Sequence, residues 1–286
     1  KMRHLRFDPA ENPLALQLGG SEPSDLAKCA KIAEEWGYNE VNLNVGCPSE
    51  RVQSGSFGAC LMLEPNLVTD GVKAMRDACD IDVTVKHRIG IDKVEDYSFV
   101  RDFVGVVAEA GCSTFIVHAR NAILKGLSPK ENRDIPPLKY DYAYQLKRDF
   151  PQLEIIINGG ITTLSDSQMH LQHVDGVMVG REAYHNPWLL SEVDAEIYGV
   201  AHVEKTRRVA MENLRGFVDA ELTSGTPIRY VARHILGLYQ GVPGARHWRR
   251  MLSDAALLKN ADWRLIEEAL NIVESRQETR YESQST

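Results

Sequence analysis

The 286-residue chain is 43% hydrophobic and 26% charged, a composition typical of a soluble globular protein with room for one large α/β domain and a smaller one. The sequence contains no run of about 18 apolar residues, as a membrane helix needs, and we expect no signal peptide. The five Cys are odd in number and contain no C-x-x-C pair, which argues against a disulfide framework or a zinc site and favours a reducing, cytoplasmic location.

Six short apolar segments, each followed by a helical pattern, predict right-handed βαβ units and a parallel sheet. The predicted strands are residues 14–18, 41–45, 83–88, 114–119, 154–158 and 176–180. The helices between them are clearest at residues 24–37, 65–79, 97–111 and 140–150. A closed (β/α)8 barrel needs eight units, so the pattern predicts either an open sheet or a barrel without its first two units.

After residue 199 the strand pattern disappears, and the remaining sequence has helical periodicity interrupted at Pro227, Pro243 and Gly244. The predicted helices are residues 204–222, 229–240, 247–259 and 263–276. We therefore predict an α/β domain over residues 1–199 and a helical domain over residues 200–286.

Cys47 is predicted to lie on a loop just after the second strand, because Gly46 and Pro48 break the alternating pattern that precedes them. An α/β enzyme collects its chemical groups at the carboxyl ends of its strands. Cys47 is therefore a candidate catalytic residue. The alternative is a small buried hydrophobic residue, the usual environment of a free Cys.

Other polar side chains are also predicted at the carboxyl ends of strands. Gln17 and Asn44 end the first two strands, Lys86 with His87 and Arg88 ends the third, and His118 ends the fourth. Three groups of cationic type in succession indicate an anionic ligand. A solvated Gln17 and a His118 with a purely structural hydrogen bond are the alternatives.

Glycines follow the fifth and sixth strands, as Asn158-Gly159-Gly160 and as Gly180-Arg181. Backbone N–H groups at such turns, together with a helix start, suit a phosphate, and Arg181 adds a bidentate contact. In TIM barrels a phosphate site often lies at the last two loops. The chain has no G-x-G-x-x-G after a strand, no Ser–His–Asp elbow and no metal-ligand spacing.

Two further segments are basic. The loop of residues 120–137 is rich in Arg, Lys and Pro, which suggests a lid, a substrate contact or an ordinary solvated loop. Residues 222–253 contain five Arg, two His and no acidic residue, so the net charge of −7 arises outside them. Within them, Arg246, Arg249 and Arg250 recur at helical spacing around Trp248, which suits phosphate contacts and stacking on bases.

Together these residues resemble the tRNA-dihydrouridine synthases, most closely the A subfamily. The matching segments are LALQLGG (14–20), NLNVGCPSERVQSGSFGACLM (42–62), VTVKHRIG (83–90), FIVHAR (115–120), LSPKENRDIPPL (127–138), INGGI (157–161), VGREAYHNP (179–187) and GVPGARHWRR (241–250). The resemblance implies an FMN-binding TIM barrel, here without its first two βα units, followed by a helical tRNA-binding domain. It implies an enzyme that reduces D-loop uridines, at tRNA positions 20 and 20a, to 5,6-dihydrouridine.

The family's mechanism would then apply. NADPH reduces FMN, N5 of the flavin passes a hydride to C6 of the uracil, and Cys47 gives a proton to C5. Lys86 would stabilise the anionic reduced flavin. The residues that match FMN contacts are Gln17, Lys86, His118, Asn158, Gly159, Gly160, Gly180 and Arg181. Those that match tRNA contacts are Asn44, Lys130, Arg133, Arg246 and Arg249. The target base must leave its stack, and no metal, membrane or protein partner is expected.

Two other functions compete with this one. An FMN-barrel reductase of a free pyrimidine or another small enone explains the phosphate site and Cys47 but gives the basic helices no task. An RNA-binding module without activity would retain tRNA and show no flavin absorbance.

Overall fold

The computed structural model describes residues 2–49, 55 and 57–284 of the chain. The chain divides into two compact units. The first is Lys1–Ile161 with Asp166–Met178, and the second is Thr162–Ser165 with Val179–Thr286. The boundary predicted at 199/200, where the strand pattern of the sequence ends, stays a prediction.

The first unit is built on a parallel sheet of six strands that follow one another in chain order. The strands are β1 (Ala15–Leu18), β2 (Glu40–Val45), β3 (Asp82–Arg88), β4 (Thr114–His118), β5 (Glu154–Asn158) and β6 (Gly176–Met178). The predicted strands and their parallel arrangement are confirmed. The sixth is shorter than predicted: it ends at Met178, and Gly180, which the prediction included in the strand, is instead the N-cap of α8.

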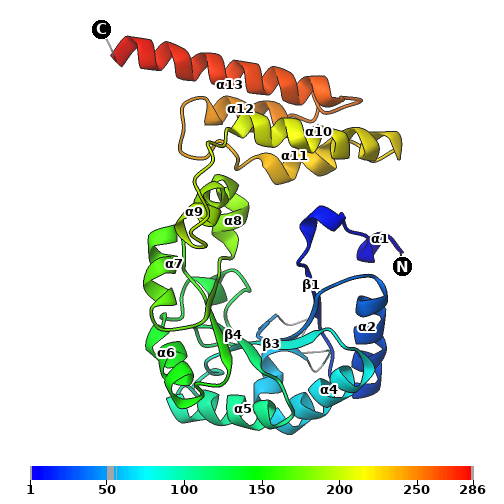
Figure 1. Ribbon diagram of the computed structural model, residues 1–286, viewed down its shortest axis with the longest axis vertical. Coiled ribbons are helices and arrows are strands. Elements are labelled where there is room, and N and C mark those ends of the chain that lie inside the picture. The colour runs from blue at the N-terminus through cyan, green and yellow to red at the C-terminus, as the bar shows by residue number, and fades with distance from the viewer. Residues whose placement is uncertain (1, 50–54, 56, 285–286) are drawn as a thin grey trace. The chain divides into compact units, whose positions relative to one another are not determined.

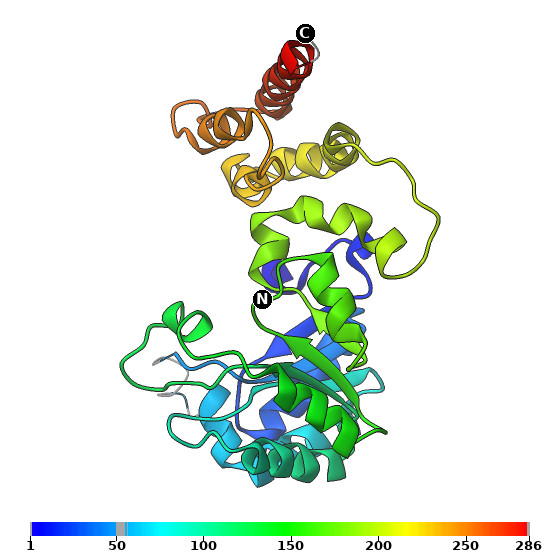
Figure 2. The same ribbon diagram turned by 90° about the vertical axis from the view of Figure 1, so that its left-hand side faces the viewer.

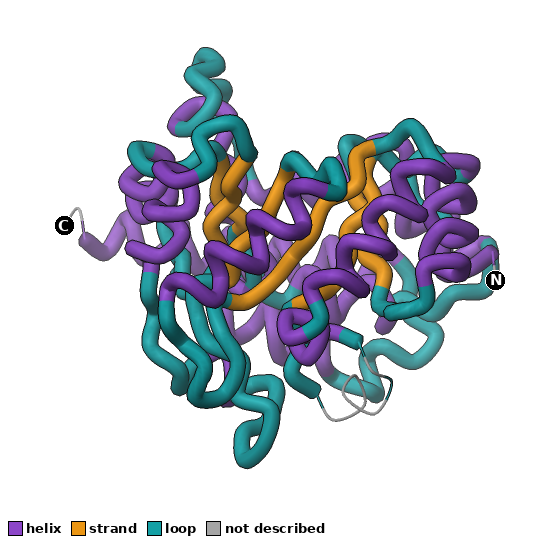
Figure 3. Tube along the Cα trace, turned by 90° about the horizontal axis from the view of Figure 1, so that it is seen from below, coloured by secondary structure: helices purple, strands orange, loops and turns teal. Residues whose placement is uncertain are grey.

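Helices connect these strands. They are α2 (Pro23–Glu35), α4 (Pro65–Ala78), α5 (Tyr97–Glu109), α6 (Tyr140–Asp149) and α7 (Leu164–Leu171), with the shorter η2 (Gly58–Leu63) and η3 (Glu131–Arg133). The short helices α1 (Met2–Leu5) and η1 (Pro9–Glu11) precede β1. In Figure 1, α2, α4, α5 and α6 follow one another along the outside of the curved sheet. Figure 3 shows helices lying across the strands, which are drawn in orange.

The two faces of the sheet differ in chemistry because side chains alternate along a strand. On β2, Val41, Leu43 and Val45 are at most 1% exposed and belong to the core. The intervening positions are Glu40, Asn42 and Asn44, so the other face of β2 is polar throughout. This polar face holds the candidate site.

The second unit is helical over the part of it that the structure describes. Its helices are α8 (Arg181–His185), η4 (Pro187–Glu192), α9 (Val193–Glu196), α10 (Arg207–Thr223), α11 (Arg229–Ile235), α12 (Ala245–Ser253) and α13 (Trp263–Gln284). A core that includes Trp248, Tyr239 and Trp263 joins α10 to α13. Figure 2 shows these four helices in yellow to red.

The helix predicted over residues 247–259 is shifted and shorter in the structure. Asp254 has an extended backbone and ends α12. Its carboxylate accepts the N–H groups of Ala256 and Leu257, which starts a turn instead of another helical turn. No helix among residues 2–49 and 57–284 is long and apolar enough to cross a membrane.

Candidate active site

The strand register gathers polar side chains at the carboxyl edge of the sheet. Asn44 of β2 pairs with Lys86 of β3, and His118 of β4 pairs with Asn158 of β5. Lys86, two residues before Arg88, lies on the same face as His118, because Arg88 pairs with His118. The structure therefore brings Asn44, Lys86, Arg88, His118 and Asn158 together on one face of the sheet.

Cys47 lies on a loop that Asn44 holds from the end of β2. The Oδ1 atom of Asn44 accepts the backbone N–H groups of Gly46 and Cys47, both at 3.1 Å. The Cys47 thiol is half-buried and donates to the hydroxyl of Ser49 at 3.4 Å, whereas Cys79 and Cys112 are buried in the core. Cys47 therefore presents a thiol, held by its own loop, at the polar edge of the sheet.

Lys86 and His87 lie on opposite faces, and this corrects the prediction of three cationic groups in a row. Nδ1 of His87 donates to the Arg88 carbonyl at 2.7 Å, and its ring packs between Phe103 and Phe115 on the apolar face. Burial lowers the pKa of His87 to about 4, so this ring is neutral at physiological pH. Of these three residues, Lys86 and Arg88 contribute positive charge to the site and His87 does not.

Lys86 is aligned by Asn158. Its Nζ donates to Oδ1 of Asn158 at 3.0 Å, and Nδ2 of Asn158 donates to the Met178 carbonyl at 2.7 Å. Burial lowers the pKa of Lys86 to about 8, and the charge of Arg88 adds to this effect. The ammonium group is therefore fixed in position and loses its proton more readily than an exposed lysine.

Arg88 connects the Cys47 loop to a second loop. Its Nε donates to the Gly46 carbonyl at 3.2 Å, and its Nη1 donates to the carbonyls of Asn121 at 3.2 Å and Asn132 at 2.9 Å. Burial lowers its pKa to about 10, which leaves the group charged at neutral pH. The sequence assigned this residue no separate role, and only a fold that brings residues 46, 121 and 132 together reveals one.

The loop of residues 120–137 is internally ordered around Asn132, a fully buried side chain. Its Nδ2 donates to the Ile123 carbonyl at 2.9 Å, and its Oδ1 accepts the Ile123 N–H at 2.8 Å. Lys130 and Arg133 stand exposed at η3 on this loop, which extends away from the sheet in Figure 2. The loop thus presents two cations from a structured base.

The turn after β5 makes a close approach that only glycine permits. Gly159 has φ of 117°, and a Cβ there would lie 2.7 Å from Cδ2 of His118. The hydroxyl of Tyr140, a residue that the sequence did not single out, donates to the Gly159 carbonyl at 2.8 Å. The turn is thereby fixed between His118 and Tyr140, with Gly160 following at φ of 71°.

Gly180 and Arg181 belong to the second unit, where Arg181 is exposed and begins α8. Their union with Gly159 and Gly160 in one phosphate site stays a prediction. Within the described ranges, no group of three or more His, Cys, Asp or Glu residues could hold a metal ion.

The basic segment of residues 222–253 has one cationic face and one core face. Arg246, Arg249 and Arg250 are exposed on α12, and Nη1 of Arg249 donates to Oε1 of Gln240 at 3.2 Å. Trp248, which the sequence suggested for stacking on bases, is instead fully buried and donates from Nε1 to the Ile235 carbonyl at 2.9 Å. The stacking prediction is wrong for this residue because it anchors the core.

A further aromatic side chain, which sequence patterns alone did not single out, lies on α11. Tyr230 is 40% exposed, and the guanidinium groups of Arg229 and Arg233 lie 5.0 and 5.6 Å from its ring centroid. Exposed rings beside arginines suit stacking on unpaired bases. The signal in the sequence was the R-Y-V-A-R spacing, which places both cations one helical turn or less from the ring.

Comparison with known proteins shows the relationship of this chain. A sequence profile described as "Dihydrouridine synthase (Dus)" matches residues 1–274. The chain is 62% identical over 251 residues to the tRNA-dihydrouridine(20/20a) synthase of Pseudomonas putida, which covers 88% of this chain and 75% of that protein. It is 55% identical over 267 residues to the protein of the same name from Vibrio cholerae, covering 93% and 82% of the two chains. The counterpart from Escherichia coli K12 is 55% identical over 271 residues, covering 94% and 79%. This chain therefore belongs to the dihydrouridine synthase family.

Proposed function

We propose that this protein reduces uridine in tRNA to 5,6-dihydrouridine. The observation that carries the proposal is the carboxyl edge of the sheet. There the loop after β2 carries a half-buried thiol, Cys47, and Asn44 at the end of β2 pairs with Lys86, which donates to Asn158. Reduction of the uracil C5–C6 bond needs a proton donor and a site for a hydride donor, and this edge offers groups suited to both. The names of the relatives agree with this reaction.

We further infer that the sheet is part of a (β/α)8 barrel whose first two βα units lie outside this chain. Among the described residues, β1 pairs only with β2 and β6 only with β5, so the sheet has two open edges. Two more strands between these edges would complete a barrel of eight. The helical domain that follows would bind the tRNA.

The residues at the carboxyl edge fit an FMN cofactor. Lys86 provides an ammonium group that donates to Asn158, and the turn of Gly159 and Gly160, both with positive φ, follows directly. A cation beside such a glycine turn suits an anionic ligand. The predicted set also includes Gln17, His118, Asn158, Gly180 and Arg181. When bound and reduced by NADPH, FMN would supply the hydride that goes to C6 of the uracil.

In this mechanism Cys47 holds the proton that is transferred from Sγ to C5 of the uracil. A general acid must be positioned before the reaction, and the two N–H bonds to Asn44 fix the backbone of its loop. Lys86 keeps a positive charge beside the cofactor, and Asn158 orients it.

We assign tRNA binding to Asn44, Lys130, Arg133, Arg246 and Arg249. The last four are exposed cations, on η3 and on α12. Exposed Arg and Lys groups attract the phosphate backbone of the tRNA. The target uridine, at position 20 or 20a of the D-loop, would leave its base stack to reach the site.

The test is to incubate the purified protein with FMN, NADPH and unmodified tRNA, and to measure dihydrouridine by mass spectrometry of the digested tRNA. Formation of dihydrouridine at positions 20 and 20a is the expected result. Comparable turnover of free uridine would instead favour the small-molecule reductase. Retention of tRNA by a colourless protein would favour the RNA-binding module.

Arg181→Ala is expected to raise the dissociation constant of FMN about 10- to 100-fold, because it would remove a charge-assisted contact to the phosphate. Flavin fluorescence titration measures this constant. Affinity for tRNA should change little. Arg101→Ala, which removes an exposed arginine paired with Asp102 on α5, is the matched control. Full flavin affinity with weakened tRNA binding would reassign Arg181 to the RNA surface.

FMN binding is expected to weaken as pH rises above about 8. The pKa of Lys86 is lowered to about 8 by burial, so the ammonium is present below this pH and is lost above it. Binding of an anion favours the charged form, and affinity must therefore fall as the free protein loses that proton. Lys86→Arg keeps its charge across this range and should remove the fall. An identical pH profile for the two proteins would contradict the assignment.

A further inference from the structure

A continuous network of side-chain hydrogen bonds crosses the polar face of β1, β2 and β3. We call its members, Glu40, Thr84, Asn42, Gln17 and Asn44, the Glu40 network. The Thr84 hydroxyl donates to the Glu40 carboxylate, and Nδ2 of Asn42 donates to Oγ1 of Thr84 at 2.7 Å. Nε2 of Gln17 donates to Oδ1 of Asn42 at 2.8 Å. Nδ2 of Asn44 donates to Oε1 of Gln17 at 3.0 Å, and Oδ1 of Asn44 accepts the N–H groups of Gly46 and Cys47.

The two ends of the network fix the direction of every bond in it. Backbone N–H groups at Gly46 and Cys47 can only donate, and a carboxylate at Glu40 can only accept. Between them stand three amides, and reversing any one would set donor against donor or acceptor against acceptor. An isolated amide side chain can be turned by 180° so that its oxygen and nitrogen exchange places. The network permits only one of these two orientations for each of Gln17, Asn42 and Asn44.

The middle of the network is shielded from water. Asn42 and Thr84 are each 3% exposed, so water cannot replace a partner that either of them loses. The network also spans the length of β2, whose five steps from Glu40 to Val45 cover about 16 Å at roughly 3.3 Å per residue. Glu40 thus lies at the amino end of the strand, far from the Cys47 loop at the other.

From these contacts we propose that Thr84 and Glu40 are positioning residues for the Cys47 loop. They act through Asn42, Gln17 and Asn44, and keep Oδ1 of Asn44 turned towards the Gly46 and Cys47 N–H groups. Amide groups do not pass protons along such a chain readily, so the network orients the loop and does not supply its proton. The role of Cys47 itself rests on the proposed function, whereas the orientation of its loop does not.

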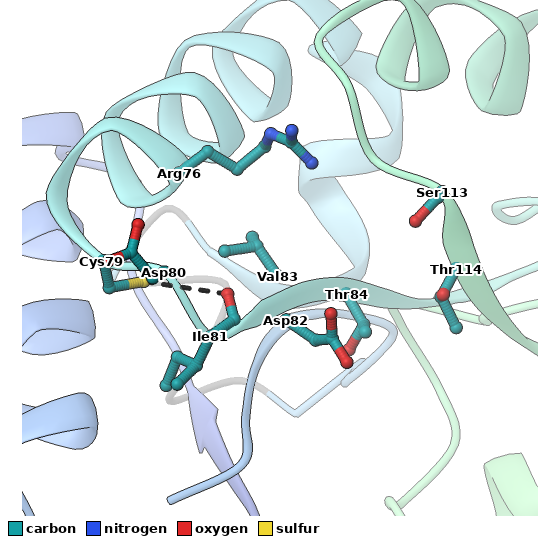
Figure 4. Close-up of a pocket in the computed structure, with 9 residues that line it drawn as sticks. All are labelled: Arg76, Cys79, Asp80, Ile81, Asp82, Val83, Thr84, Ser113 and Thr114. Atoms are coloured by element: carbon teal, nitrogen blue, oxygen red, sulfur yellow. Dashed lines mark hydrogen bonds between the residues drawn. The ribbon is translucent and has the colours of Figure 1, made fainter.

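The chain offers a matched control on the neighbouring strands. The hydroxyl of Thr114, on β4, donates to Oε2 of Glu154, on β5, at 2.8 Å. This is the same Thr–Glu pair, but no chain of amides continues from it to Asn44 among the bonds of the described residues. Thr84 and Thr114 line one pocket of about 280 Å³ near the amino ends of β3 and β4 (Figure 4).

The experiment compares Thr84→Val, Thr84→Ser and Thr114→Val in the purified protein. Amide hydrogen exchange at Gly46 and Cys47, followed by mass spectrometry of peptides that cover them, needs neither cofactor nor tRNA. Thr84→Val should accelerate this exchange roughly three- to ten-fold, because Asn42 loses its acceptor and the orientation of Asn44 is weakened. Thr84→Ser keeps the hydroxyl and Thr114→Val keeps the network, so both should stay within about two-fold of the wild type.

The rate of dihydrouridine formation provides a second measurement. Thr84→Val should lower kcat for dihydrouridine formation about ten-fold and raise KM for tRNA by less than that, since Asn44 is disturbed but the four exposed cations are not affected. Thr84→Ser should restore kcat. If the exchange and kcat of Thr84→Val match those of Thr114→Val, the proposal is overturned. If exchange accelerates in Thr84→Val but even the wild type forms no dihydrouridine, the network stands and the proposed function fails.

A second pair of variants covers the case in which Thr84→Val does not fold. Glu40 is only half-buried, so Glu40→Leu places less strain on folding while it removes the acceptor of the Thr84 hydroxyl. Glu40→Gln keeps an acceptor oxygen and should behave as the wild type. Exchange at Gly46 and Cys47 at least about two-fold faster in Glu40→Leu than in Glu154→Leu is expected, and equal exchange in the two would overturn the proposal.

Discussion

Cys47→Ala is expected to lower the rate of dihydrouridine formation about 10²- to 10⁴-fold, the usual cost of removing a general acid. The reason is structural as well as chemical. The thiol is half-buried and free of any disulfide, on a loop that Asn44 holds from one side and Arg88 from the other. The substitution removes only Sγ and its bond to Ser49, so the loop should keep its backbone hydrogen bonds.

The measurement separates the two halves of the reaction. NADPH oxidation in the absence of tRNA and flavin content should equal those of the wild type, while dihydrouridine, counted by mass spectrometry of digested tRNA, should nearly vanish. Cys29→Ala removes an exposed cysteine on α2 and should leave both halves unchanged. If Cys47→Ala forms dihydrouridine at the wild-type rate, Cys47 is not the proton donor.

Replacing Arg246 and Arg249 together by Gln is expected to flatten the plot of log affinity for tRNA against log salt concentration. Its slope should fall by roughly 0.7–0.9 for each tRNA phosphate that the variant no longer neutralises. Both side chains are exposed on α12, on the face opposite Trp248 and the core. Glutamine preserves helix propensity, so the fold should tolerate the change. Flavin content and NADPH oxidation without tRNA should be unaffected.

A charge-matched control distinguishes direct phosphate binding from net charge. Arg264 pairs with Asp262, and Arg215 with Asp219, elsewhere on the second unit. Replacing Arg215 and Arg264 by Gln makes the same change in net charge and should leave the salt slope as in the wild type. An unchanged slope in the Arg246 and Arg249 variant would identify α12 as a solvated helix face and remove the support that this helix gives to RNA binding.

The sequence predicted the strands well because they follow from local chemistry. Alternating apolar residues mark β2, and Gly46 with Pro48 marks its end, within a few residues of one another. Since parallel strands share a carboxyl edge, the meeting of Asn44, Lys86 and Asn158 could be expected from the order of elements alone.

What could not be predicted depends on contacts between distant parts of the chain. In the sequence, Arg88 is one of three successive residues of cationic type. In the structure it donates to the carbonyls of residues 46, 121 and 132, which are distant from it in the chain. Trp248 looks like a surface aromatic among arginines, and only the packing of α10 to α13 shows it as core. The error over His87 was avoidable, because strand alternation by itself places it opposite Lys86 and Arg88.

The order of the strands has a consequence for how the protein is made. Each strand from β2 to β6 pairs with the strand that precedes it in the chain, so each finds its partner already synthesised when it leaves the ribosome. Gln17, Asn42 and Thr84 all precede residue 89, and their hydrogen bonds can form long before the turn at Gly159 exists. The buried amide of Asn42 is thus satisfied early in translation, and the growing sheet need not carry it unpaired while the second half of the chain is still being translated.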